Sequence, residues 1–303
     1  MADPYFIGAL CTPMDEQENL HDEGLEIHLF DQWNSGIQGT LIGGTMGFMQ
    51  MLRDQTYRDL IRRAVEIASG KIELLVGVGD TSTARTLDRI EYVNRFDVDG
   101  VVVLPPCFMA WEDDDLLHQL RTCADTARAP VFLYDLPQVV GRSMSVNMIV
   151  EAAKHPNIKG LKASGMPEIP SQVRELVRDD FRVILAQPFM IAHLLRAGFN
   201  EHLDGLFAMA PKTTVAIGEA ARAGDWDQAD RLQLEFNDFV RFLRDQGIRT
   251  SFPPMLNEHG VPGVFTPQPL TPLEGEELES LMKHPVVKAY LQREGRLQMP
   301  VSV

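Results

Sequence analysis

Short apolar runs alternate with longer amphipathic segments along most of this chain, and this alternation predicts strands that are each followed by a helix. The apolar runs that we interpret as strands are Tyr5–Thr12, Gly39–Ile42, Ile72–Val78, Gly100–Leu104, Pro130–Tyr134, Ile158–Lys162, Phe181–Ala186 and Leu203–Phe207. The amphipathic segments that we interpret as helices are Asp22–Ser35, Asp54–Ser69, Thr81–Arg95, a segment beginning near Glu112, Val146–Lys154, Glu168–Val177, Phe189–Ala197 and Thr213–Arg222.

Two of these helices carry recognisable start signals. Asp80 and Thr81 are candidate N-terminal caps of the third helix. The acidic run Glu112–Asp115 predicts the first turn of the fourth helix, where the macrodipole favours negative charge, rather than a cation site.

Eight strand-then-helix units by residue 222 have the number and length of a (β/α)8 barrel, an α/β fold. A doubly wound parallel sheet is the alternative, but the Gly-x-Gly-x-x-Gly turn expected after its first strand is missing. We therefore predict a TIM barrel over residues 1–222 that holds the catalytic centre.

The pattern after residue 222 is helical and lacks strand signals. A long amphipathic helix is predicted over Trp226–Gln246, followed by a Pro-rich crossover, Phe252–Pro272, and a last helix or pair over Glu274–Arg293. We predict that residues 223–303 form a helical region packed on the barrel.

Composition narrows the range of partners. The 303 residues have a formal net charge of −15 and no basic cluster, which argues against nucleic acid and anionic membranes as partners. The three cysteines, Cys11, Cys107 and Cys123, form neither a zinc pattern nor a disulfide framework. No membrane span or targeting segment is predicted, so we expect a cytoplasmic protein.

The ends of the predicted strands carry the candidate chemistry, because the active sites of such barrels lie there. The second strand leads into a glycine-rich loop, Gly43–Phe48, the fifth ends at Tyr134 and the sixth ends at Lys162. Desolvation lowers the pKa of a lysine amine among apolar neighbours, and an unprotonated amine attacks ketones to form Schiff bases. Each residue taken alone has a commoner structural role: such a lysine extends to solvent, a tyrosine packs and a threonine stabilises a turn.

The ordered set is more specific. Five motifs that occur in order resemble the dihydrodipicolinate synthase/N-acetylneuraminate lyase family across nearly the whole chain: Ala9-Leu10-Cys11-Thr12-Pro13, Gly44-Thr45-Met46-Gly47, Tyr134-Asp135-Leu136-Pro137, Gly160-Leu161-Lys162 and Ala223-Gly224-Asp225-Trp226. The resemblance implies a barrel with C-terminal helices, commonly a tetramer, that joins a lysine to pyruvate or another 2-oxo acid. It implies that Lys162 forms the Schiff base, Tyr134 relays protons, and Thr45 with backbone amides near Gly44 holds the carboxylate.

The chain departs from the family pattern at several positions. Met46 replaces the second threonine of the family's pair, and Phe48 replaces a glutamate. Phe108, preceded by Cys107, stands where the synthases place a tyrosine that completes a proton relay across a subunit interface. The segment after Lys162 is short. Arg142 lies further from the tyrosine motif than the synthases' substrate-binding arginine, so it is either an equivalent anion ligand or a solvated loop charge.

These observations favour a Schiff-base lyase that cleaves or dehydrates a small 2-oxo acid, and argue against dihydrodipicolinate synthase activity. No metal or organic cofactor is required, because the imine is the electron sink. Met46, Phe108 and Arg142 are predicted to contact substrate. Met46, Phe48, Met49 and Met51 otherwise read as packing or interface residues. We expect a homo-oligomer, either a tetramer or a dimer.

Two rival hypotheses remain at this point. A weakened family member that binds a 2-oxo acid, or serves as a scaffold, would explain the missing hydroxyls at Met46 and Phe108. A metal-dependent barrel lyase would need a carboxylate/His cluster, and His21, His28, His193 and His202 show no shared spacing that suggests one.

Overall fold

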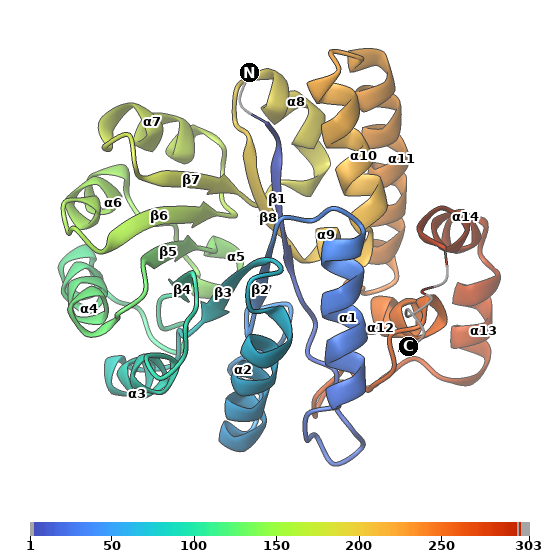
Figure 1. Ribbon diagram of the computed structural model, residues 1–303, viewed down its shortest axis with the longest axis horizontal. Coiled ribbons are helices and arrows are strands. Elements are labelled where there is room, and N and C mark those ends of the chain that lie inside the picture. Colours follow the sequence, from blue (N-terminus) through green and yellow to red (C-terminus); the bar gives the residue numbers. More distant parts are fainter. Residues whose placement is uncertain (1–2, 296, 298–303) are drawn as a thin grey trace.

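The computed structural model describes residues 3–295 and residue 297, with residues 248–250 described by their backbone only. Residues 1, 2, 296 and 298–303 lie outside the described residues; they include the start of the chain and the end of the predicted region 223–303. Eight parallel strands pair in sequence order and close into a barrel, with β8 beside β1 (Figure 1). The predicted (β/α)8 barrel with a C-terminal helical extension is confirmed.

All eight predicted strands are present. They are β1 (Tyr5–Ala9), β2 (Gly39–Ile42), β3 (Glu73–Gly77), β4 (Gly100–Val103), β5 (Val131–Asp135), β6 (Ile158–Ala163), β7 (Arg182–Leu185) and β8 (Glu201–Asp204).

Helices surround this barrel in the expected order. They are α1 (Asp22–Asn34), α2 (Asp54–Ala68), α3 (Thr83–Val93), α4 (Asp113–Thr126), α6 (Val146–Ala153), α7 (Glu168–Leu176), α8 (Ile191–Arg196, after the 3-10 turn Pro188–Met190) and α10 (Pro211–Arg222). Two short helices, α5 (Pro137–Val140) and α9 (Gly205–Met209), follow β5 and β8 and were not expected.

The position of β8 differs from the prediction of a strand over Leu203–Phe207. The strand ends at Asp204, and the rest of the apolar run forms α9. Apolar periodicity cannot separate a short buried strand from a buried helix. The Asp204 side chain favours a helix after residue 204, because it accepts a hydrogen bond from the Leu206 backbone N–H (2.9 Å) and so caps α9.

The start signals of α3 and α4 had different outcomes. Ser82, and not Asp80 or Thr81, caps α3 by accepting a hydrogen bond from the Arg85 N–H (3.3 Å). Asp80 instead pairs with the buried guanidinium of Arg89 (2.9 Å). The polar residue before the helix therefore forms an ion pair rather than a cap. The acidic run before α4 behaves as predicted, with Glu112 and Asp115 forming a capping box.

Alternate side chains of the strands, together with Met49 and Leu104 from the segments that follow β2 and β4, fill the barrel with apolar groups. This interior cluster consists of Ile7, Ala9, Leu41, Met49, Leu75, Val102, Leu104, Phe132, Tyr134, Ile184 and Leu203. Gly160 belongs to the same arrangement: a Cβ there would lie 2.6 Å from the ring of Phe132. The glycine before Leu161-Lys162 is therefore required by the close approach of an interior aromatic ring.

A polar layer closes the amino-terminal end of the barrel. Arg182 pairs with Glu73 across the barrel and with Glu201 on the next strand (2.6 Å), and Tyr5 donates to Glu73 (2.9 Å). These charges satisfy one another. The chemistry of the opposite, carboxyl-terminal end is thus separated from them by the apolar interior cluster.

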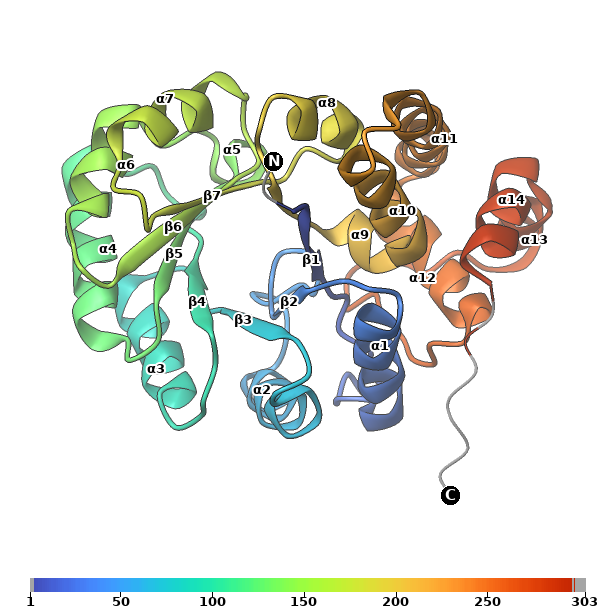
Figure 2. The same ribbon diagram turned by 45° about the horizontal axis from the view of Figure 1, so that its top comes forward.

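The C-terminal helices lie together on one side of the barrel, away from α4 and α6 (Figure 2). They are α11 (Trp226–Asp245), α12 (Ile248–His259), α13 (Gly275–Lys283) and α14 (Pro285–Glu294). The predicted last pair over Glu274–Arg293 is confirmed as α13 and α14. The boundary between residues 222 and 223 stays a prediction.

The predicted Pro-rich crossover, Phe252–Pro272, is wrong at its start, because α12 continues to His259 with Pro253 and Pro254 inside it. Proline normally ends or kinks a helix by removing a backbone hydrogen bond. Here Phe252, Met255 and Leu256 are completely buried, and this tertiary packing stabilises the helix despite the prolines.

The last helix is fixed to the barrel by two buried polar side chains. The Glu294 carboxylate accepts hydrogen bonds from the backbone N–H groups of Lys212 (3.0 Å) and Thr213 (3.1 Å), in the first turn of α10. Tyr290 donates to the carbonyl of Met209 at the end of α9. The C-terminal helices thereby hold the segment that directly follows β8.

Within residues 3–295 and 297, no helix has the length and apolar character needed to cross a membrane. In the same part of the chain, His, Cys, Asp and Glu side chains form no group of three or more that could hold a metal ion.

A buried polar cluster lies between α1 and α12. His28, Asp31 and His259 are almost fully buried, and the Nε2 of His259 lies 3.4 Å from a carboxylate oxygen of Asp31. Burial lowers the pKa of His28 to about 4; Asp31 opposes this shift and His259 reinforces it. The fold therefore holds His28 in its neutral form.

This burial predicts a loss of stability in acid. The unfolded chain protonates His28 near its ordinary pKa and the folded chain only near pH 4, so the unfolded state binds more protons in that window and stability falls as the pH falls. We expect His28→Leu to remove on the order of 2 kcal/mol of the stability loss between about pH 7 and about pH 4.5, measured by urea unfolding. His118→Gln, an exposed histidine on α4, is the control. An unchanged pH dependence in His28→Leu would contradict this assignment.

Candidate active site

Lys162 and Tyr134 lie side by side at the carboxyl-terminal end of the barrel. The two residues are direct partners in the register between β5 and β6, and the Nζ of Lys162 lies 3.9 Å from the centre of the Tyr134 ring. Lys162 is 4% exposed and Tyr134 is 5% exposed. The amine therefore sits on an aromatic face among apolar side chains, in an environment suited to nucleophilic attack on a carbonyl.

The glycine-rich loop after β2 supplies a free hydroxyl. Gly43 has a left-handed backbone (φ 57°), and the carbonyl of Gly44 accepts a hydrogen bond from the Met49 N–H (3.2 Å). Thr12, three residues after β1, fixes the loop by donating to the carbonyl of Gly47 (2.9 Å). The Thr45 hydroxyl is buried and has no hydrogen-bond partner among the described residues, so it is available to a ligand.

Met46 faces the end of β8 across the mouth of the barrel. A Cβ on Gly205 would lie 2.4 Å from the Cε of Met46 and 2.8 Å from its Cγ. The loop after β2 and the Asp204–Gly205 step are therefore in contact. Met46 fills the space that a side chain at residue 205 would otherwise occupy.

Asp204, a part-exposed residue, ends β8 at this mouth, and the sequence patterns did not single it out. Burial raises the pKa of the Asp204 carboxyl, while the backbone hydrogen bond from Leu206 and the nearby charge of Lys162 act in the opposite direction. The signal in the sequence was an acidic residue inside the apolar run Leu203–Phe207. A strand predicted to continue past residue 204 concealed that it lies at a strand end.

Arg142 is engaged by residues at the start of α4. Its guanidinium pairs with Asp113, donates to the carbonyl of Trp111 (3.2 Å) and lies 4.7 Å from the centre of the Trp111 ring. The side chain is 39% exposed. Binding a substrate anion would require Arg142 to share or leave these contacts, so the structure favours the reading as a loop charge.

Phe108 points away from the protein and is 81% exposed. Two other exposed apolar side chains are on the same and a neighbouring loop, namely Met109 (71%) and Met51 (40%). The Cys107 thiol donates to the Gln50 side chain (3.4 Å) and links these two loops. We call Met51, Phe108 and Met109 the mouth patch.

A small cavity of about 120 Å³ adjoins the glycine-rich loop. Its lining is mostly apolar and consists of Thr45, Phe48, Met49, Gln50, Met51, Leu104 and Val139. Leu104 and Met49 also belong to the interior cluster that contains Tyr134. The cavity offers no cation to a substrate.

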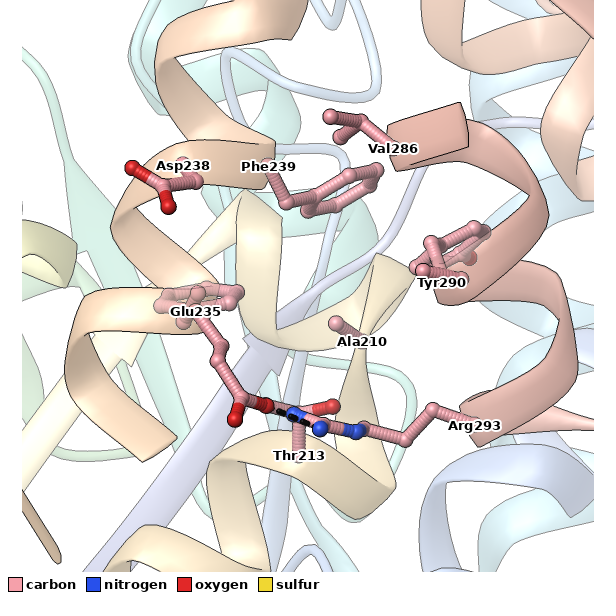
Figure 3. Close-up of a pocket in the computed structure, with 10 residues that line it drawn as sticks. Ala210, Thr213, Glu235, Asp238, Phe239, Val286, Tyr290 and Arg293 are labelled. Carbon is pink, nitrogen blue, oxygen red and sulfur yellow. Dashed lines mark hydrogen bonds and ion pairs between the residues drawn. The ribbon is translucent and has the colours of Figure 1, made fainter. Parts of the chain in front are cut away.

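A larger cavity of about 380 Å³ lies between α10, α11 and α14 (Figure 3). Phe239 and Tyr290 stack in its wall, with ring centres 4.3 Å apart, and Glu235 pairs with Arg293 across it. None of the predicted site residues lines this cavity, and no lysine lines it. We interpret it as a packing gap between the C-terminal helices and the barrel.

Comparisons with known proteins point to one family. Residues 5–288 match the model of the dihydrodipicolinate synthetase family. A 4-hydroxy-tetrahydrodipicolinate synthase of Exiguobacterium sp. is 29% identical over 227 residues, which are 75% of this chain and 78% of that protein.

Solved structures share the fold. N-acetylneuraminate lyase from Mycoplasma synoviae superposes with a TM-score of 0.84 at 19% identity, over 96% of this chain and 97% of that one. A variant of the Sulfolobus solfataricus 2-keto-3-deoxygluconate aldolase gives 0.84 at 20% identity, over 94% and 96%.

The contact between Met46 and Gly205 predicts a coupled pair of substitutions. Gly205→Ala forces Met46 to move, and overpacking of this kind costs about 1–3 kcal/mol. We expect a smaller cost in a Met46→Ala background, because the two closest atoms are then gone and only the Cβ of residue 46, 3.1 Å away, remains near the added methyl group. Urea unfolding of the four proteins measures this difference. An equal cost in both backgrounds would mean that the two segments do not touch in solution.

Proposed function

Because the chain belongs to the dihydrodipicolinate synthetase family, we propose that it is a lyase that forms a Schiff base between Lys162 and a small 2-oxo acid. The observation that carries the proposal is the buried amine of Lys162 on the face of Tyr134, at the end of the barrel where such sites lie. The family match and the order of the motifs along the chain support it.

The proposed reaction begins with attack of the Lys162 amine on the 2-oxo carbon. The carbinolamine loses water and becomes a protonated imine, which accepts the electron pair released when a neighbouring carbon–carbon bond breaks or a proton leaves. Tyr134, paired with Lys162 across β5 and β6, is in position to transfer protons at this carbon. Hydrolysis of the imine releases pyruvate or the corresponding 2-oxo acid.

The carboxylate of the substrate needs donors in a protein of charge −15. The unpartnered hydroxyl of Thr45 and the backbone N–H groups of the loop around Gly44 are the donors that we assign to it. This assignment uses hydrogen bonds rather than a fixed cation.

We propose that the reaction is not that of the synthases for which the family is named. Met46 and Phe108 lack hydroxyl groups, and the guanidinium of Arg142 is committed to Asp113 and Trp111. Reversible aldol cleavage that releases pyruvate, or dehydration of a 2-keto-3-deoxy acid, needs only the Lys162–Tyr134 centre. N-acetylneuraminate lyase and 2-keto-3-deoxygluconate aldolase have the same fold.

The imine predicts a specific adduct. Incubation with pyruvate and borohydride should add one reduced pyruvyl group, detected by intact-protein mass spectrometry, and Lys162→Ala should abolish it. Lys159→Ala is the matched control, because Lys159 lies on the same strand but pairs with Asp180 at the surface (2.6 Å). Tyr134→Phe should lower turnover about 10²- to 10⁴-fold.

The outcomes separate the proposed lyase from its rivals. Absence of an adduct with pyruvate and with a panel of other 2-oxo acids would sink the Schiff-base reading. An adduct without turnover of any substrate would favour the weakened binding protein. Loss of activity on chelation, with trapping unchanged, would favour a metal-dependent reaction.

We also propose that a second copy of the chain covers the mouth patch, as a dimer or within a tetramer. Phe108, Met109 and Met51 together present apolar surface beside the candidate site, and exposed apolar groups that cluster mark interfaces. The neighbouring loops that carry them are joined through Cys107 and Gln50. We further propose a cytoplasmic location, because the three cysteines are free and reduced thiols are usual in that compartment.

The interface predicts that a charge in the mouth patch dissociates the oligomer. Phe108→Asp should shift the mass measured by light scattering toward that of the monomer, because the charge would be buried without a partner. Leu176→Asp is the control, since Leu176 is an isolated exposed residue on α7 (60%). An unchanged oligomer in Phe108→Asp would place the interface elsewhere.

A further inference from the structure

Asp204 is a carboxylate in the barrel mouth to which the proposed chemistry has so far given no role. It is the last residue of β8, directly after Leu203, which belongs to the interior cluster that also contains Tyr134. Register pairs Asp204 with Gly8 on β1, so it lies at the same end of the barrel as the loop after β2.

Contacts of the next residue locate this strand end more closely. Gly205 packs against Met46, whose neighbour Thr45 carries the unpartnered hydroxyl. β6 and β8 are separated only by β7, and Lys162 pairs with Ile184 while His202 pairs with Leu185, one residue further along β7. Asp204 therefore ends its strand above the level of Lys162, between Lys162 and the Thr45–Met46 loop.

The direction of the side chain follows from the turn at Asp204. Strict alternation would place it outside the barrel with His202, because Leu203 points inward. The strand ends here, however, and the chain turns into α9 with the carboxylate folded over the Leu206 N–H. Residue 204 is part-exposed, whereas His202 is fully buried, so Asp204 does not share the closed surroundings of His202.

The electrostatic surroundings suit proton transfer. Among residues 3–295 and 297, no lysine, arginine or histidine forms an ion pair with Asp204, so no cation holds its carboxylate in the charged form at contact distance. Burial raises the pKa of this carboxyl, and Lys162 is the nearby charge that opposes the rise. The protonated imine formed at Lys162 keeps a positive charge in the mouth, and this charge favours the ionised carboxylate, the form of Asp204 that accepts a proton.

We propose that Asp204 is the catalytic base that removes the proton from the hydroxyl group of the carbon lost in cleavage, so that the substrate is a 4-hydroxy-2-oxo acid. This inference rests on the Schiff-base function proposed above. Tyr134 and Asp204 would then transfer different protons. Tyr134 serves the imine carbon and C3, and Asp204 serves the oxygen on C4.

The step balances without any further reactant. The Asp204 carboxylate takes the proton of the C4 hydroxyl as the oxygen forms a carbonyl and the C3–C4 bond breaks. The electron pair of that bond moves to C3 and makes the neutral enamine of the protonated imine. The aldehyde leaves, C3 takes a proton, water hydrolyses the imine, and the proton on Asp204 returns to solvent. In the direction of addition, Asp204 donates that proton to the alkoxide oxygen.

Asp135 provides a matched comparison within the same chain. It is also a carboxylate at a strand end whose pKa burial raises, and it also accepts a backbone hydrogen bond, from the Met144 N–H (2.9 Å). Its carboxylate, however, faces Gly165 and Ser143 rather than the mouth. A general effect of removing a buried carboxylate would appear equally at both residues.

The experiment separates imine chemistry from aldol chemistry in Asp204→Asn, which keeps the helix cap. We would measure borohydride trapping of pyruvate, exchange of the pyruvate methyl protons in D2O, and addition of pyruvate to acetaldehyde and benzaldehyde. We expect trapping and methyl exchange within about threefold of wild type and aldol addition reduced about 10²- to 10⁴-fold. Asp204→Ser, another good cap without a basic group, should behave the same, and Asp135→Asn should retain all three activities.

Each other outcome overturns the proposal. Aldol addition within about threefold of wild type in Asp204→Asn would show that Asp204 is not the base. Loss of methyl exchange together with addition, in folded protein, would show that Asp204 acts on the imine step. If the wild-type protein exchanges the methyl protons of pyruvate but adds pyruvate to neither aldehyde, a 4-hydroxy-2-oxo acid is excluded as the substrate. Failure of wild-type trapping is a different result, because it overturns the Schiff-base function itself.

Discussion

The pairing of Lys162 with Tyr134 is the contact on which the rest of the site depends. An amine that lies on an aromatic face, inside an apolar barrel, is kept from bulk water. Closure of the barrel produces this arrangement, because it fixes β5 and β6 in one register. Phe132 fills the space below, and it fits because Gly160 has no side chain.

The mouth above this pair is divided between apolar and polar residues. Met46 and the lining of the small cavity are apolar, whereas Thr45 and Asp204 carry the groups that hydrogen-bond or titrate. Arg142, the cation nearest in sequence to the tyrosine motif, is held by Asp113 at the start of α4. The substrate that we propose, a 4-hydroxy-2-oxo acid with one carboxylate, would match this distribution better than an acid with two carboxylates.

The C-terminal helices contribute to the site from a distance. Glu294 holds the first turn of α10 and Tyr290 holds the end of α9, and α9 begins directly after Asp204. The strand end that carries Asp204 is thus stabilised from both sides, by the barrel and by α14. The larger cavity lies between α10, α11 and α14, next to these contacts (Figure 3).

The sequence by itself determined the barrel, because apolar period and segment length distinguish strands from helices wherever the segments are long. It also placed Lys162 and Tyr134 at strand ends and Thr45 in the loop after β2. Only the tertiary structure decided the features that depend on contacts between distant segments. The prolines of α12 are tolerated through packing, Arg142 is drawn to Asp113, and Asp204 ends β8 because its carboxylate caps α9. Local patterns carry no information about such partners, which lie far apart in the chain or compete within a single apolar run.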